Sequence, residues 1–128
     1  MKLNVLAAGA LSALTGIALG AFGAHGLKNW LSPEWLAVYH TGVSYQIWHA
    51  LGLIAIALLQ QPQPDSSSLA WASRLMLAGI VLFSGSLYLL ALLNLKWLGM
   101  ITPIGGLCFL AAWALVAQHA IQHHSNKD

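Results

Sequence analysis

Polar side chains that can bind ligands or transfer protons occur within apolar stretches of this 128-residue chain. Imidazoles bind metals and haem and exchange protons near neutral pH, while hydroxyl and amide groups orient polar ligands. Ionisable side chains within membrane-length apolar segments are rare and by default indicate a functional site. The candidate ligand-binding residues are His25, His40, Thr41, Tyr45, Gln46, His49, Ser84, Ser86 and Thr102.

Helical spacing places part of this set on one face. At 100° per residue, Thr41, Tyr45 and His49 stack along a helix, and Gln46 lies beside them. We therefore expect the candidate residues to surround one cavity in one half of the membrane, with His49 deepest and hydrogen-bonded to another helix. The alternative is structural, because Ser, Thr and His in membrane helices also hydrogen-bond between helices, at about 0.6–2 kcal/mol per bond.

Other chemistries lack the residues that they need. His25 and His40 have only Glu34 as a nearby carboxylate, which is a poor ligand set for zinc or copper. His49 has no second histidine at its depth for bis-histidine haem ligation. No nucleophile–base pair, Walker loop or dinucleotide fingerprint occurs. We expect no catalytic residues, no metal and no cofactor, and the sequence leans against an enzyme.

The elements that must position these residues are membrane-spanning helices. Hydrophobic residues make up 59% of the chain and charged residues 6%, against roughly 25% charged in soluble domains. A span needs about 20 apolar residues. Backbone groups in hydrocarbon must be paired internally, so each span is expected to be a helix. The predicted fold is an all-α membrane protein, a single domain over 1–128 with four transmembrane helices in a compact antiparallel bundle. The spans are expected at about 3–24, 40–59, 72–93 and 98–117, and a flexible tail at 119–128.

The connections support this division. Ser32, Pro33 and Glu34 form a helix start, so the second helix can begin near Pro33, before its span. The polar segment 60–68 separates the second and third spans, and the short turn at 94–97 makes the third and fourth antiparallel neighbours.

Orientation follows from the basic residues. Lys2, Arg74 and Lys127 lie on the side of the two termini, and Lys28 and Lys96 lie on the other side. Three against two favours cytoplasmic termini by the positive-inside rule.

The first span carries a stripe of small residues for helix packing. Their spacing of four, three, four and three residues permits close approach of another helix, either in this chain or in another one. A signal peptide is the alternative interpretation of this segment, but the apolar run is longer than usual. The stripe consists of Gly9, Ala13, Gly16, Gly20 and Gly23.

Four sequence blocks resemble the bacterial domain of unknown function 423 family. They are 20–26 (GAFGAHG), 39–46 with 49–52 (YHTGVSYQ and HALG), 83–88 (FSGSLY) and 101–106 (ITPIGG). The resemblance covers essentially the whole chain. It implies a small four-helix protein of the bacterial inner (cytoplasmic) membrane with no assigned activity.

Three functional hypotheses remain at this point. The first is a non-enzymatic protein that forms a homo-oligomer or a small subunit of a membrane complex. The second is binding or transport of a small polar or amphipathic molecule through the one-sided polar cavity, and a membrane enzyme or redox protein is third. The lipid bilayer is the expected environment. Nucleic acid is not an expected partner, because the net charge of +2 forms no basic patch.

Overall fold

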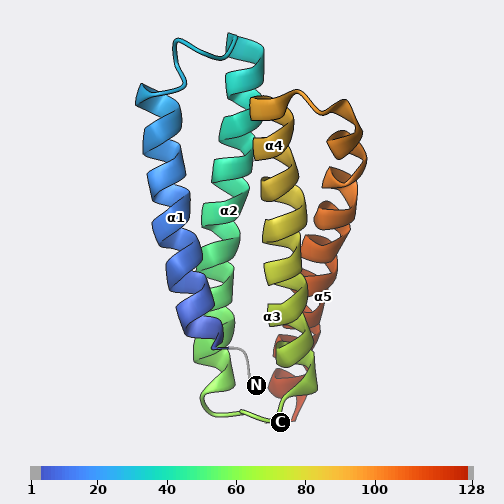
Figure 1. Ribbon diagram of the computed structural model, residues 1–128. Coiled ribbons are helices and arrows are strands. Elements are labelled where there is room, and N and C mark those ends of the chain that lie inside the picture. Colours follow the sequence, from blue (N-terminus) through green and yellow to red (C-terminus); the bar gives the residue numbers. More distant parts are fainter. Residues whose placement is uncertain (1–3, 127–128) are drawn as a thin grey trace.

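Four long helices cross the molecule in alternating directions in the computed structural model, which describes residues 4–126 (Figure 1). Each is long and apolar enough to span a membrane, so the predicted four-helix membrane fold is confirmed. The third span contains a π-helical turn, and a 3-10 turn precedes the fourth. The elements are α1 (Val5–His25), α2 (Pro33–Gln60), α3 (Ser67–Gly79), η1 (Ile80–Ser84), α4 (Gly85–Leu93), η2 (Lys96–Met100) and α5 (Thr102–Ser125).

Polar side chains cap three of the helix starts. The side chains of Asn4, Ser32 and Ser66 accept hydrogen bonds from backbone N–H groups three residues further along, which satisfies donors that a helix start leaves free. The second helix begins at Pro33, where the sequence predicts its start. It is 28 residues long, or about 42 Å at 1.5 Å per residue, so it extends beyond the hydrocarbon.

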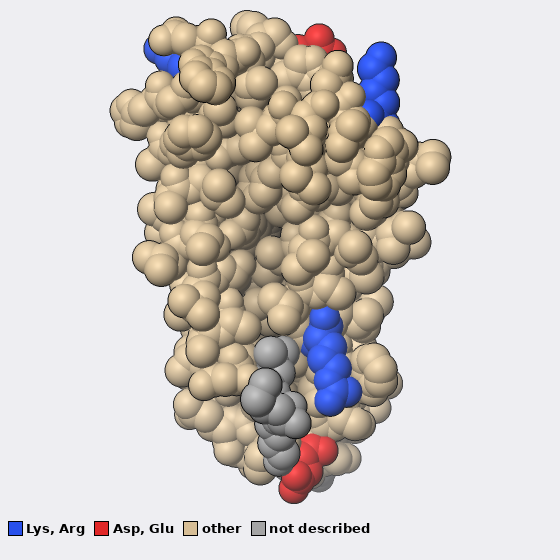
Figure 2. All heavy atoms as spheres, in the orientation of Figure 1, with Lys and Arg blue, Asp and Glu red and all other residues tan. Residues whose placement is uncertain are grey.

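The spans form a row in which two helices are inner and two are outer. Helix α1 packs mainly on α2, α2 packs on the third span, and α5 packs mainly on α3 and η1. The start of α1, the loop at 61–66 and the end of α5 lie together at one end of the molecule, here named the terminal end (Figure 1). The opposite, distal end carries the connections at 26–32 and 94–101. On the face that Figure 2 shows, charged side chains lie toward the two ends, and the surface between them is uncharged.

The small-residue stripe of α1 faces α2 of the same chain. A Cβ atom added at any of the four glycines would lie 2.5–3.1 Å from an α2 atom, so these glycines permit the observed approach. Ala13 lies half-buried among them. The contacted residues include Ala50 and Ile54 for Gly9, Ile47 for Gly16, Val43 for Gly20 and Tyr39 for Gly23.

Two features depart from the sequence predictions. Helix α5 continues through the predicted tail to Ser125, because His119 is buried and its Nδ1 lies 3.3 Å from Ser66 Oγ. His123 also contacts the Gln63 side chain. Residues 127–128 lie outside the described part, as does residue 3 at the predicted start of the first span. The second departure is the π-helical turn η1, for which the sequence carries no signal.

Candidate functional site

Gln46 joins three of the four spans through its amide group. Its Nε2 atom donates to the Ser12 carbonyl oxygen and to Thr15 Oγ1, both at 2.9 Å. Its Oε1 atom accepts the Tyr88 hydroxyl at 2.6 Å. Gln46 is buried, and both ends of its amide have partners, so these contacts hold α1, α2 and α4 together and leave little capacity for a ligand.

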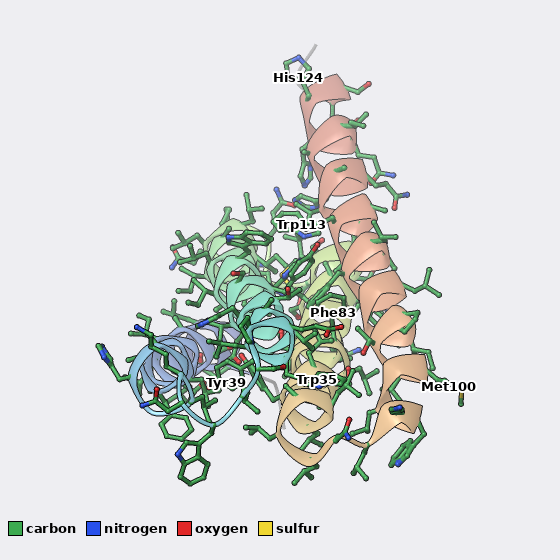
Figure 3. All side chains as sticks on the ribbon, turned by 90° about the horizontal axis from the view of Figure 1, so that it is seen from above. Trp35, Tyr39, Phe83, Met100, Trp113 and His124 are labelled. Atoms are coloured by element: carbon green, nitrogen blue, oxygen red, sulfur yellow. The ribbon has the colours of Figure 1, made fainter. Side chains whose placement is uncertain are left out.

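Tyr39 extends this polar layer toward the distal end. The side chain is fully buried, and its hydroxyl donates to the Leu19 carbonyl oxygen at 2.6 Å. Its ring lies 5.2 Å from that of Tyr88, centroid to centroid. Figure 3, viewed along the spans, shows Tyr39 on the side of α2 toward α1, and Phe83 and Trp113 on the side toward α5.

Tyr39 is not among the residues predicted from the sequence, although its spacing from Gln46 carries a usable signal. Tyr39 and Gln46 are seven residues apart, which places them on one helical face. Thr41, Tyr45 and His49, on which the prediction was based, stack along a different face of the same helix.

His49 lies on the other face of α2, against α5. Its Nδ1 atom lies 2.7 Å from the Tyr45 carbonyl oxygen, one turn back in its own helix. Because a carbonyl only accepts, Nδ1 must carry the proton, and a neutral ring then has an acceptor at Nε2. The ring stacks on Phe109 with centroids 3.5 Å apart. The prediction that His49 forms a hydrogen bond to another helix is therefore wrong, and the contact of His49 with α5 is aromatic.

Ser86 and Thr102 connect the third span to α5. Their hydroxyl oxygens are 2.6 Å apart, and Ser86 also donates to the Phe83 carbonyl oxygen at 2.9 Å. This pair lies nearer the distal end than the His49 contact and is not joined to Gln46 by any hydrogen bond recorded among the described residues. The polar groups thus form separate contacts between pairs of helices.

Two buried hydroxyls have no hydrogen-bond partner among the described residues, namely those of Ser12 and Ser84. Ser84 is fully buried and ends the π-helical turn η1. Its carbonyl oxygen lies 3.3 Å from the position of a Cβ added at Gly42, which places the turn directly against α2. π-helical turns occur frequently at functional sites.

Three of the candidate residues stand apart from these contacts. His25 is exposed at the end of α1. His40 is half-buried with its ring edge-on to Tyr39. Thr41 is exposed, and its hydroxyl donates to the Ala37 carbonyl oxygen of its own helix at 3.0 Å.

Four surface pockets formed by residues 4–126 are lined by none of the nine candidate residues. The most polar one, of about 530 Å³, lies at the terminal end between the 62–68 segment and α5. Within residues 4–126, no group of three or more His, Cys, Asp or Glu side chains is placed to hold a metal ion.

Comparisons with known proteins identify relatives over most of the chain. The family model "Protein of unknown function (DUF423)" matches residues 19–106. UPF0382 membrane protein YwdK of Bacillus subtilis is 46% identical over 115 residues, which cover 90% of this chain and 94% of the relative. UPF0382 inner membrane protein YgdD of Escherichia coli K12 is 42% identical over 113 residues, which cover 88% of this chain and 86% of the relative. No solved structure matches the chain. The chain therefore belongs to the DUF423 family and is a multi-pass protein of the inner membrane.

Proposed function

We propose that the chain is a non-enzymatic membrane protein that works as a helical subunit, associating with further copies of itself or with another membrane protein. The observation that carries this proposal is the use of the central polar groups. The Gln46 amide is occupied at both ends by α1 and α4, and the candidate residues line none of the pockets described above. Because the central polar groups hold the helices together, we expect the function to depend on the outer surface.

The outer helices are the surfaces available for association. We compare the buried share of an 18-residue apolar window in each span. This share is 22% for α1 and 17% for the last span, whereas it is 44% for α2. On α5, Leu107 and Leu110 are largely exposed. Packing between membrane helices depends on close van der Waals contact, which such exposed faces can supply to a second chain.

Cysteine cross-linking in native membranes tests this proposal. Cys108 is first replaced by Ser, and a single cysteine is then placed at Leu110 on α5 or at Leu51 on α2, which are 68% and 57% exposed. We expect a cross-linked species, either a dimer or a heavier adduct, at Leu110 and none at Leu51. Monomer alone at Leu110 and at an equivalent α1 position, Leu14, would rule out association through the outer helices.

A second function is favoured by one specific observation, the unpartnered Ser84 hydroxyl on the π-helical turn. Binding of a small polar or amphipathic molecule among α2, η1 and α5 would give this hydroxyl a partner and could engage Nε2 of His49, which faces α5. The expectation is that His49→Phe and Ser84→Ala both lose a retained small molecule. Wild-type protein that retains no such molecule after gentle extraction would exclude this alternative.

A further inference from the structure

Arg74 is a charged residue on the surface of the third span. It lies seven residues after the start of α3 at Ser67, or about 10 Å along the helix. Its guanidinium carbon is 5.2 Å from the centre of the Trp71 ring, in a cation–π contact. Trp71 is exposed, as is typical of tryptophans at the membrane–water interface. Arginine at this depth is costly unless it reaches the interface or an anionic partner.

Two pockets share Arg74 as a lining residue. The first, of about 390 Å³, lies between the end of α2, the start of α1 and α3, and its polar walls include Gln60, Gln61 and Ser73. The second, of about 460 Å³, is a shallow groove whose other walls are Leu77, Ala78, Val81 and Leu82. Arg74 therefore stands where a polar pocket meets an apolar groove.

The groove runs along one face of the third span, away from the terminal end. Its residues follow Arg74 at three, four, seven and eight positions, which is the spacing of a single helical face. Eight residues correspond to about 12 Å of helix, directed toward the middle of the bilayer. A ligand that occupies both pockets must have a polar end and a long apolar part.

The charges specify the polar end further. Among the described residues that line the two pockets, Arg74 is the single charged side chain, and no carboxylate is present to pair with an amine. A guanidinium binds phosphate oxygens through two parallel hydrogen bonds. Basic pockets between membrane helices on the cytoplasmic side bind anionic lipid headgroups, and the positive-inside rule favours the cytoplasm for this end.

We propose that Arg74 and this groove bind one anionic phospholipid. The phosphate pairs with the guanidinium beside Trp71, the glycerol region faces Gln60, Gln61 and Ser73, and one acyl chain lies along Leu77, Ala78, Val81 and Leu82. The bound lipid occupies the outer surface of the third span at the terminal end, so this site is independent of the polar contacts around Gln46.

Native mass spectrometry of protein taken from bilayers with equal amounts of phosphatidylglycerol and phosphatidylethanolamine tests the site. We expect wild-type protein to retain one phosphatidylglycerol in preference to phosphatidylethanolamine. Arg74→Gln should reduce that preference about fivefold, the factor that corresponds to about 1 kcal/mol per cationic residue at a membrane surface. Arg74→Lys should retain part of it. Lys96→Gln is the charge control, because Lys96 lies at the distal end.

A second pair of variants tests the acyl groove without changing charge. Ala78→Phe fills the groove and should lower retention, whereas Ala114→Phe adds the same bulk on the exposed face of α5, away from Arg74 and the groove. Equal retention of the two lipids by wild-type protein, or equal losses in Arg74→Gln and Lys96→Gln, would overturn the proposal. The proposal would also be overturned if delipidated protein bound inorganic phosphate as tightly as it binds the lipid, because the groove would then contribute nothing to the affinity.

Discussion

The contact between α5 and the π-helical turn η1 depends on Gly105. A Cβ atom added there would lie 2.4 Å from the backbone nitrogen of Phe83 and 2.8 Å from its Cα. The shorter distance is 1.0 Å less than the 3.4 Å at which ordinary contact begins. Because the obstacle is backbone and not a flexible side chain, α5 itself must move away. Gly105→Ala should therefore separate α5 from the third span.

The expected cost is that of an overpacked core site, about 1–3 kcal/mol of unfolding free energy. Alanine offsets part of this cost, because it is favoured over glycine in a helix by about 1 kcal/mol. Gly106→Ala is the matched control, since its Cβ would lie 3.8 Å from a ring carbon of Phe83, an ordinary distance. Both variants share the propensity gain, so the difference between them isolates the clash.

Unfolding by SDS from mild detergent, followed by tryptophan fluorescence, measures this difference. We expect Gly105→Ala to unfold at a clearly lower SDS fraction than wild-type protein, and Gly106→Ala to match or exceed wild type. If the two alanine variants unfold together, the close approach of α5 to η1 does not exist, and the π-helical turn would not be the surface on which α5 packs.

Three further predictions concern the other contacts. Gln46→Leu keeps the bulk but removes three hydrogen bonds, so at about 0.6 kcal/mol per bond it should cost about 2 kcal/mol of unfolding free energy. The double variant with Tyr88→Phe should lose less unfolding free energy than the two single variants added together, and strict additivity would show that the two side chains do not interact. Gly16→Leu should destabilise the protein by forcing α1 from α2, and unchanged thermal stability would contradict the contact with Ile47. Cysteines placed at Gln63 and Lys28 should label from opposite membrane sides, and labelling from the same side would remove one span.

The spans were predictable because hydropathy acts over about 20 residues and tolerates local detail. The start at Pro33 was equally accessible, since the Ser32 cap is a local property of the chain. The stripe beginning at Gly9 indicated a packing face, but spacing alone could not say that α2 of the same chain covers it. Lateral neighbours depend on tertiary contacts that no single helix encodes.

The arrangement of the polar groups was less predictable, for a related reason. Helical periodicity assigns Tyr45 and His49 to one face and Gln46 to the next, but it does not reveal which neighbouring helix each face meets. Gln46 meets Ser12 and Thr15 of α1, whereas His49 meets Phe109 of α5. Similar depth in the membrane therefore does not predict that polar side chains meet in one cavity, because side chains at similar depth lie on opposite sides of α2.

Native mass spectrometry of protein released gently from its own membrane tests the proposed function most directly, because it reports partner chains and retained small molecules together. For both wild-type protein and His49→Phe, we expect masses of two or more copies, or of this chain with another protein, and no adduct other than lipid. A monomer that carries a non-lipid molecule, lost in His49→Phe, would contradict the proposed function.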